Sequence, residues 1–369
     1  MSLDKSIDNL RKIIGPKKFK KIFVLSGKNS FFLSGADKIL KKSITTQKCL
    51  YYFKKSKIPE LNELKKIIVK INSFQPDLIL AIGGGTVLDY AKIASSITKI
   101  ENIKQNIIQS KYKIIKKRPL LAIPTTAGSG SEVTSNAVIY IDKRKYSVEN
   151  NSLLPEHYLL IPKLIRGLNK KIKSSSGFDA IAQSIESLFS KKSNQKSIYY
   201  AKKSLKISFK NYISFIEKPT IRNTMRMCLA ANLSGRAISI SKTTAPHALS
   251  YPFTSHFGIS HGHAVSLTIN DFLKFNYENM KHANCKFSLN DRYNILFKLT
   301  KSKNINDLDA YISNLKKKAK LEMNFKKLKI NIDQSIPKIL SGVNLQRLSN
   351  NPIKLRQSNL KSILKNRSS

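Results

Sequence analysis

The chain has 369 residues, 41% of them hydrophobic, and a formal net charge of +45 at pH 7, which is the composition of a globular protein with two domains or one large one. It contains no run of about 18 apolar residues, which excludes a membrane-spanning helix and a membrane partner. Lysines are spread along the whole chain, so we expect a solvated basic surface that attracts small anions and has no specific nucleic-acid site.

The first residues and the cysteines both predict a cytoplasmic protein. Residues 1–6 have neither the apolar core of a signal peptide nor an arginine-rich transit pattern. Cys49, Cys228 and Cys285 are scattered, without the spacing of a metal site or a disulfide framework. Because thiols stay reduced in the cytoplasm, we expect three reduced structural cysteines.

The first part of the chain alternates between predicted strands and predicted helices. Short apolar or β-branched runs typical of strands lie at 21–25, 49–53 and 77–82. Helical spacing of apolar residues is found between them, at 35–42 and 59–73. This order predicts an α/β domain with a doubly wound parallel sheet, which we place at residues 1–160.

Two predicted strands run directly into loops of small residues. Three glycines and Thr86 follow the strand at 77–82, and the free amides of the next helix would suit a pyrophosphate. Seven small or hydroxyl residues follow the strand that ends at Pro124, and they would suit a phosphate or ribose. Either loop alone could be a tight turn, whereas the pair favours a nucleotide site. A further strand at 138–141, followed by a turn at 142–145, is predicted at the far edge of the sheet.

Strand signals stop near residue 155, and helical patterns continue to the end of the chain. We place the domain boundary near residue 160 and predict an all-helical domain at residues 161–369. A helix that follows 174–179 would put Asp179 and Gln183 on one face, with Glu186 three residues further on. An alanine-rich apolar helix is predicted at 225–240 and should be central to this domain.

Residues 244–263 hold four of the six histidines in a segment without lysine. They are His247, His256, His261 and His263. Imidazoles are the commonest metal ligands and the usual proton carriers near neutral pH. One such histidine taken alone would more often be a hydrogen-bonded core residue. Four together predict an interior functional site.

Five motifs in this order resemble the iron-containing (group III) alcohol dehydrogenase family over nearly the full length. They are Gly83-Gly-Gly-Thr with Asp89, the segment 124–132, Gly177-x-Asp-Ala with Glu186, His247-Ala-Leu, and Phe257-Gly-Ile-x-His-Gly. The resemblance implies a dehydroquinate synthase-like architecture, in which a dinucleotide-binding α/β domain precedes an all-helical domain and a metal lies in the cleft between them.

The resemblance also implies which residues bind the cofactor and the metal. The pyrophosphate, ribose and nicotinamide side of NAD(P)H would contact Gly84, Gly85, Thr86, Asp89, Thr125, Thr126, Ser131 and Lys145. One divalent metal, either iron or zinc and with manganese as a further candidate, would be held by Asp179, Gln183, His247 and His261.

This chain departs from the family pattern at three positions. The second metal ligand is usually histidine and is here Gln183, whose amide is a weaker donor for iron or zinc and either ligates the metal or lies beside the ligands. A histidine usually found near the nicotinamide is here Tyr251, which we assign a catalytic role in proton relay or substrate binding, with a structural role as the alternative. The acidic residue typical of NAD selectivity is replaced by Ser26-Gly27-Lys28, so NADPH is possible beside NADH.

The implied reaction is reversible hydride transfer between a nicotinamide and a small anionic aldehyde or alcohol, with the metal as a Lewis acid. Gln183 with the segment 242–251 is most similar to the branch that reduces phosphonoacetaldehyde to 2-hydroxyethylphosphonate. A branch that acts on the terminal hydroxymethyl of octulosonate sugar acids is the alternative. A redox-inactive cofactor-binding protein and a charge-driven nucleic-acid binder are the hypotheses from other classes. We also expect a homo-oligomer, most simply a dimer.

Overall fold

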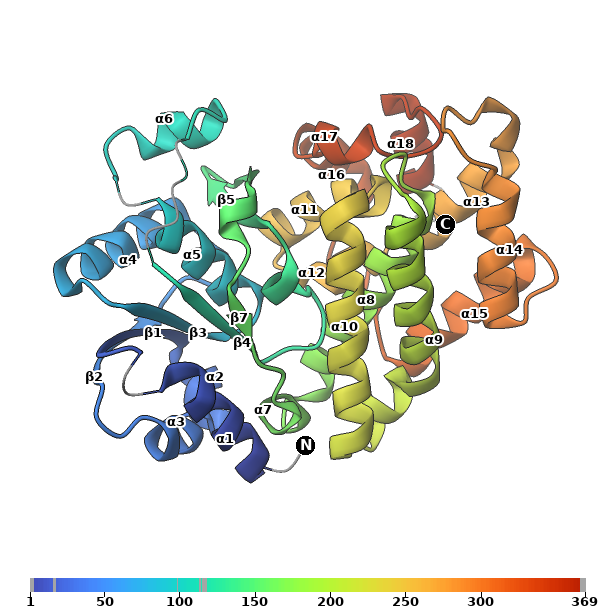
Figure 1. The fold of residues 1–369 in the computed structure, drawn as a ribbon. Helices are drawn as coiled ribbons and strands as arrows, with labels where there is room; N and C mark the ends of the chain where they lie inside the picture. The colour runs from blue at the N-terminus through green and yellow to red at the C-terminus, as the bar shows by residue number, and fades with distance from the viewer. Residues whose placement is uncertain (1–2, 16–17, 98, 113, 115–117, 366–369) are drawn as a thin grey trace. The chain divides into compact units, whose positions relative to one another are not determined.

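The computed structural model describes the whole chain except residues 1–2, 16–17, 98, 113, 115–117 and 366–369. The chain forms two compact units (Figure 1). Unit 1 comprises Met1–Leu168 and Pro219–Cys228, and unit 2 comprises Asn169–Lys218 and Leu229–Ser369. The predicted fold, a parallel α/β domain followed by an all-helical domain, is confirmed. The domain boundary at residue 160 stays a prediction, because compact units are defined by packing and not by independent folding.

Unit 1 is built on a parallel sheet with the strand order β2-β1-β3-β4-β7. The strands are β1 (Lys21–Gly27), β2 (Lys48–Lys54), β3 (Leu78–Gly83), β4 (Leu120–Pro124) and β7 (His157–Tyr158). From β1 the chain adds β2 on one side and then β3 on the other, which makes the sheet doubly wound. Ligands of such sheets bind outside the carboxyl ends of the strands at the point where the order reverses, here between β1 and β3.

Helices cover both faces of this sheet. They are α1 (Leu3–Ile14), α2 (Lys28–Leu33), α3 (Ala36–Ser43), α4 (Leu61–Phe74), α5 (Gly85–Ser96), α6 (Ile103–Ile108) and α7 (Pro162–Arg166). Phe23 and Leu25 of β1 pack with α4 and α5 in one core cluster. Ile22 and Val24, which point to the other face, pack with α1 and α3 in a second cluster. Burial on both faces explains why residues 22–25 of β1 and the whole of β3 are apolar.

The predicted position of the strand at 138–141 is wrong. This segment lies in β5 (Asn136–Ile141), which forms a separate antiparallel hairpin with β6 (Arg144–Glu149). Asp142 and Lys143 between them both have left-handed backbone conformations, with φ of 50° and 63°, which is the two-residue turn that folds a strand back on itself. The edge of the parallel sheet is instead β7, which pairs over two residues and is too short to give a periodic signal.

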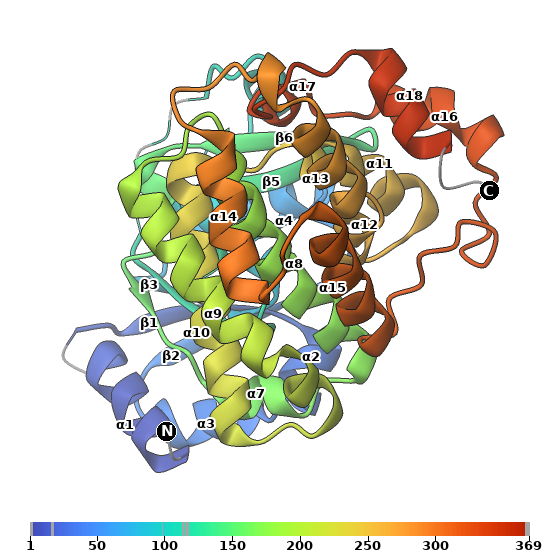
Figure 2. The same cartoon turned by 90° about the vertical axis from the view of Figure 1, so that its right-hand side faces the viewer.

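Unit 2 is helical. Its helices are α8 (Lys170–Phe189), α9 (Gln195–Glu217), most of α10 (Ile221–Ser241), α11 (Ala245–Phe257), α12 (His261–Ser266), α13 (Ile269–Glu278), α14 (Leu289–Thr300), α15 (Ile305–Lys318), α16 (Ile332–Ser341), α17 (Leu345–Leu348) and α18 (Gln357–Lys365). A short 3₁₀ turn lies at Met280–His282 in this unit, and two more lie in unit 1 at Ser131–Val133 and Asn151–Leu153. Helix α8 is buried along most of its length and packs against α9, α12 and α14 (Figure 2).

The segment 174–179 was predicted to precede a helix, and it lies inside α8. The helix begins at Lys170 because the Asn169 side chain accepts a hydrogen bond from the Ile172 amide (2.8 Å). The predicted central helix at 225–240 is contained in α10. Among the described residues, no helix combines the length and the apolar character that crossing a membrane requires.

Candidate metal and cofactor sites

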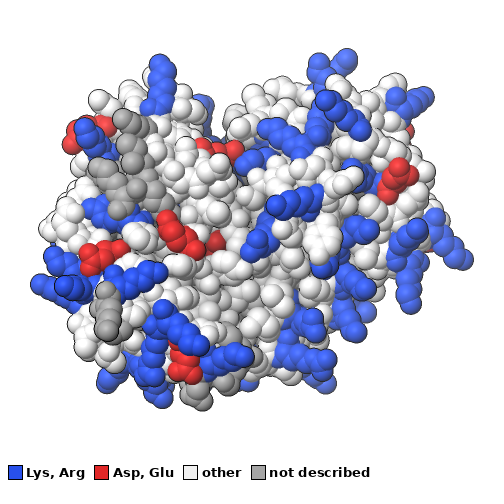
Figure 3. Space-filling model, viewed as in Figure 1, with Lys and Arg blue, Asp and Glu red and all other residues white. Residues whose placement is uncertain are grey.

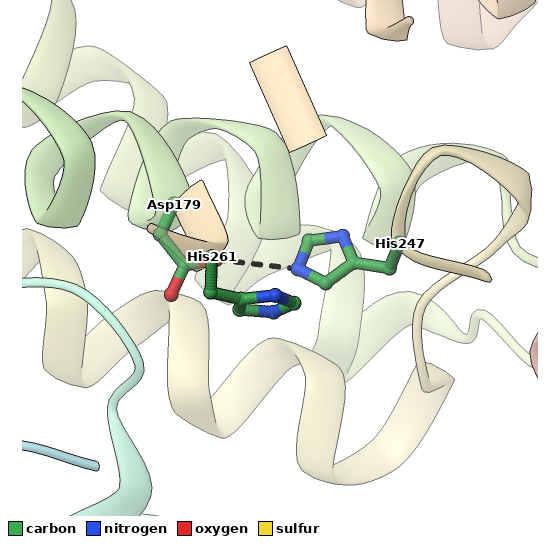
Figure 4. A group of neighbouring side chains, drawn as sticks. All are labelled: Asp179, His247 and His261. Atoms are coloured by element: carbon green, nitrogen blue, oxygen red, sulfur yellow. Dashed lines mark hydrogen bonds and ion pairs between the residues drawn. The ribbon is translucent and has the colours of Figure 1, made fainter. Parts of the chain in front are cut away.

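Three side chains from three helices of unit 2 converge on one point (Figure 4). They are Asp179 of α8, His247 of α11 and His261, the first residue of α12. One potential ligand atom from each lies within 4.8 Å of the other two. Asp179 Oδ1 is 3.2 Å from His247 Nε2. Ligand atoms around one tetrahedral ion are about 3.4 Å apart. One carboxylate and two imidazoles at these distances therefore fit a divalent cation.

The close approach of α12 to α8 depends on Gly262. A Cβ built on this glycine would lie 2.0 Å from the Ser175 carbonyl oxygen and 2.8 Å from Asp179 Cβ, so any larger residue would push the helices apart. The His263 amide also donates a hydrogen bond to Ser175 Oγ (3.1 Å). The small residues of 174–177 thus let α12 pack closely enough on α8 to bring His261 beside Asp179.

Glu186 fixes the other imidazole. One of its oxygens, Oε1, accepts hydrogen bonds from the amides of Thr244 (2.9 Å) and His247 (3.2 Å), which are free donors at the start of α11. The other oxygen is in close contact with His247 Nδ1. A carboxylate on Nδ1 sets the ring orientation and leaves Nε2 facing Asp179. The sequence motif contained Glu186 without assigning it this role.

The charge around His247 is suited to a cation. Burial alone would lower the pKa of this imidazole, but the charges and hydrogen bonds of Glu186 and Asp179 outweigh burial and raise its pKa to about 9. The metal-free chain therefore holds a proton between His247 and Asp179 at neutral pH. Since metal ligands must be deprotonated, a divalent cation would take the place of this proton.

Gln183 lies one turn from Asp179 on α8 and is buried. Its amide oxygen is 3.0 Å from the hydroxyl of Ser234 on α10, which donates to it. The amide thus has a partner on the side of α10. Of the four clustered histidines, His256 and His263 lie outside the group. The Nε2 of His263 is instead hydrogen-bonded to the Glu322 carbonyl oxygen (2.6 Å).

Tyr251 follows His247 by one turn of α11, and its ring stacks on the His261 imidazole, with centroids 5.6 Å apart and an angle of 14° between the planes. Its hydroxyl is hydrogen-bonded to Thr243 and Arg347. Burial raises the pKa of Tyr251 to about 12, so the phenol keeps its proton at neutral pH. The structure thus puts a protonated hydroxyl next to a candidate metal ligand.

The two small-residue loops of unit 1 touch each other at the carboxyl ends of β3 and β4. Gly84 is the N-cap of α5, and a Cβ on it would contact the Thr126 side chain at 3.4 Å. A Cβ on Gly85 would lie 3.3 Å from Ser129 Oγ. The Thr125 amide bonds to the Gly83 carbonyl oxygen (2.9 Å) and continues the sheet ladder into the loop. The amides of Gly85 and Thr86 begin α5, where an anion is favoured.

The remaining predicted cofactor residues form a network behind these loops. Ser131 Oγ donates to one oxygen of Asp89 (2.8 Å), and the Val138 amide donates to the other (3.1 Å). The charge of Lys145 on β6 acts on the same carboxyl. Fully buried Lys92 bonds to Thr134 Oγ1 (2.7 Å). This network fixes the shape of the 125–131 loop, and direct contact of its members with a cofactor stays a prediction.

An α/β unit with a glycine loop at its switch point and a helical unit with a carboxylate–imidazole cluster are the features expected of proteins that bind a dinucleotide and a metal. Comparison with known families names this class of proteins. Residues 2–162 match the family described as iron-containing alcohol dehydrogenase, and residues 173–368 match the C-terminal part of the Fe-containing alcohol dehydrogenase family. The chain belongs to the iron-containing alcohol dehydrogenase family.

Three relatives are informative. The 4-hydroxybutyrate dehydrogenase of Clostridium kluyveri is 29% identical over 62% of this chain and 62% of its own length. The phosphonoacetaldehyde reductase of Streptomyces viridochromogenes is 30% identical over 56% of this chain and 55% of its own length. The sulfoacetaldehyde reductase of Bifidobacterium kashiwanohense, solved with NAD⁺, superposes with a TM-score of 0.86 at 25% identity and covers 99% of this chain and 95% of its own. The chain thus matches less than two thirds of the length of the two curated relatives, the 4-hydroxybutyrate dehydrogenase and the phosphonoacetaldehyde reductase.

Proposed function

We propose that this chain is a metal-dependent, NAD(P)-linked alcohol dehydrogenase that works as an aldehyde reductase. In this reaction the nicotinamide gives a hydride to the carbonyl carbon and a proton goes to the oxygen, which yields an alcohol and NAD(P)⁺. The observation that carries the proposal is the convergence of Asp179, His247 and His261 in a chain of this family. NAD⁺ in the related sulfoacetaldehyde reductase structure supports the nicotinamide cofactor.

Each residue of the cluster has a proposed task. Asp179, His247 and His261 hold the metal, and Glu186 keeps His247 oriented toward it. A bound metal supplies Lewis-acid polarisation of the carbonyl oxygen. Tyr251, which keeps its proton at neutral pH, donates a hydrogen bond or a proton to the substrate. In unit 1, Gly84, Gly85 and Thr86 hold the cofactor pyrophosphate, and Thr125, Thr126 and Lys145 line its sugars.

Gln183 is proposed to lie beside the ligands and not to bind the metal. The hydrogen bond from Ser234 supports this assignment, because it occupies one of the two lone pairs of the amide oxygen and directs that oxygen toward α10. Three protein ligands are the usual complement of a catalytic metal, since they leave a position for substrate. Gln183→His should then raise metal affinity, and Ser234→Ala should leave it unchanged.

The proposed substrate is a small aldehyde with an anionic end. The names of the three relatives denote short molecules that carry a carboxylate, a phosphonate or a sulfonate. Lysine and arginine side chains are scattered widely over the face in Figure 3, as expected of a surface that attracts anions. Phosphonoacetaldehyde is the best candidate, and an octulosonate-type sugar acid is the alternative. Lys28, the exposed first residue of α2 directly after β1, supports use of NADPH beside NADH.

The test is an assay of the full chain with iron(II), zinc or manganese and a panel of small aldehydes that includes phosphonoacetaldehyde. NADH and NADPH consumption is followed by absorbance at 340 nm, and bound metal is measured in the same samples. We expect one metal per chain and metal-dependent oxidation of at least one of the two cofactors. Metal binding without any turnover would favour the redox-inactive alternative, and absence of both metal binding and turnover would refute the proposal.

A further inference from the structure

We propose that Arg347 is the residue that binds the anionic end of the substrate and so selects charged aldehydes over neutral ones. This inference rests on the proposed function for the reaction. It goes beyond that function by assigning substrate selectivity to one side chain, which lies beyond the last of the five sequence motifs.

Arg347 is held in a fixed place beside the metal cluster. It lies on α17, a helix of four residues whose cap, Asn344, accepts a hydrogen bond from the Arg347 amide (2.8 Å). The Asn344 amide donates to the carbonyl oxygen of Ala248, the residue after His247 (3.3 Å). At the other end, the Asn350 side chain donates to the Thr243 carbonyl oxygen (3.1 Å). These bonds fasten α17 to both sides of the first turn of α11.

The guanidinium of Arg347 is separated from a candidate metal ligand by one aromatic side chain. Arg347 has an exposed fraction of 5% and hydrogen-bonds the hydroxyl of Tyr251. A hydrogen bond places its donor about 3 Å from the phenol oxygen. The Tyr251 ring in turn stacks on His261 at 5.6 Å. A short aldehyde whose carbonyl oxygen lies at the cluster could therefore reach the guanidinium with its other end.

The chemistry of this position suits an anion. A guanidinium offers five N–H donors in a planar fork, so one contact with a phenol is compatible with further contacts to a carboxylate, phosphonate or sulfonate. Keeping a positive charge away from water costs free energy, and an anionic ligand offsets that cost where a neutral chain does not. Glu186, an acidic side chain close enough to influence Tyr251, is engaged by His247 and Thr244.

The experiment compares Arg347→Gln and Arg347→Lys with the wild-type chain, all loaded with zinc. The substrates are two matched pairs, phosphonoacetaldehyde against propanal and 4-oxobutanoate against butanal. Arg118→Gln is the control, because Arg118 is another buried arginine, in unit 1, and hydrogen-bonds Gln75 (3.2 Å). Equilibrium binding of phosphonoacetate, measured by calorimetry, gives a readout that needs no turnover.

We expect Arg347→Gln to lower kcat/KM for the anionic aldehydes about 100-fold and to change the neutral ones less than about 3-fold. Phosphonoacetate binding should weaken by about the same 100-fold, and Arg347→Lys should retain part of both because it keeps a point charge. Arg118→Gln should match the wild type. Equal losses with anionic and neutral aldehydes would show that Arg347 only supports Tyr251, and a wild-type chain that prefers propanal would also overturn the inference.

The two proposals fail in different ways. If the wild-type chain reduces no aldehyde, the proposed function is wrong, and phosphonoacetate binding still decides the role of Arg347. Unchanged binding in Arg347→Gln would then refute the selectivity assignment. If neutral aldehydes are reduced well and anionic ones are not, the proposed function stands and the assignment of Arg347 falls.

Discussion

In unit 1 the groups proposed to bind the cofactor are backbone amides and small side chains on two loops, whereas in unit 2 the groups proposed to bind the metal are three polar side chains on three helices. The two loops pack closely because glycine has no side chain, since a Cβ on Gly85 would crowd Ser129. The metal cluster is shaped by side chains that hold other side chains, as Glu186 holds His247. The first site should therefore be sensitive to added atoms, and the second to removed partners.

Gly262 is an exception to this contrast, because the metal cluster of unit 2 also depends on a glycine. We expect Gly262→Ala to abolish stoichiometric metal binding and to destabilise the fold by about 1–3 kcal/mol, since the new Cβ would collide with the α8 backbone at Ser175. Metal content and the midpoint of thermal unfolding check both effects. Gly167→Ala is the matched control, because a Cβ there meets nothing within 4 Å. Normal metal content in Gly262→Ala would contradict the packing argument.

Glu186→Gln removes a charge that supports the cluster while keeping the size of the side chain. We expect metal affinity to fall about 10- to 100-fold, because an uncharged amide in place of the Glu186 carboxylate would orient the His247 ring less firmly and make it a less basic ligand. The measurement is competition for zinc with a chelator, and Glu63→Gln, a buried glutamate in unit 1, is the control. An unchanged zinc affinity would mean that Glu186 serves α11 as a cap and has no effect on the metal.

The raised pKa of His247 predicts a pH dependence that unit 1 should not share. Below pH 9 metal binding must displace one proton, so zinc affinity should rise about 10-fold per pH unit up to pH 9 and level off above it. The folded pKa lies above the unfolded value of about 6.5. The metal-free chain thus has this stabilisation in full below pH 6.5 and loses it as pH rises through 9. Zinc affinity that does not change between pH 6 and 9 would contradict this.

Gly85→Ala tests whether the glycine loop of unit 1 binds the cofactor independently of the metal cluster in unit 2. The added Cβ would lie 3.3 Å from Ser129 Oγ, at the start of α5 where the pyrophosphate is proposed to bind. We expect NAD(P)H affinity to fall about 10-fold while zinc affinity stays the same. Fluorescence titration of the cofactor and chelator competition for zinc measure the two quantities on one sample. A loss of zinc with cofactor binding intact would reverse the assignment of the two sites.

The sequence was most informative where the residues proposed to bind the cofactor directly follow a predicted strand. The strands before Gly83 and Thr125 are continuous apolar runs, and the glycine and hydroxyl residues come immediately after them. The resemblance to the family supplied Asp179, His247 and His261, which no spacing rule brings together across more than 80 residues. In unit 1 the strand and turn at 138–145 were predicted, but their separation from the parallel sheet was not, because a local strand pattern does not show which strand it pairs with.

The supporting residues of unit 2 were harder to predict for a physical reason. Ser234 meets Gln183 from a helix 51 residues away along the chain. Arg347 lies on a single helical turn, which is too short for any periodic pattern, and reaches Tyr251 from almost 100 residues away. Glu186 was visible in the motif, but its bond to His247 depends on how α11 begins. Such contacts follow from tertiary packing and leave no local signal.

The most direct measurement for the central claim is the metal content of the purified chain after zinc loading and dialysis, compared with Asp179→Ala, His247→Ala and His261→Ala. The account predicts one zinc per wild-type chain and a large loss in each of the three variants, with His263→Ala retaining the metal. Zinc retained at one per chain in all three variants would contradict it, because the three side chains would then not share one ion.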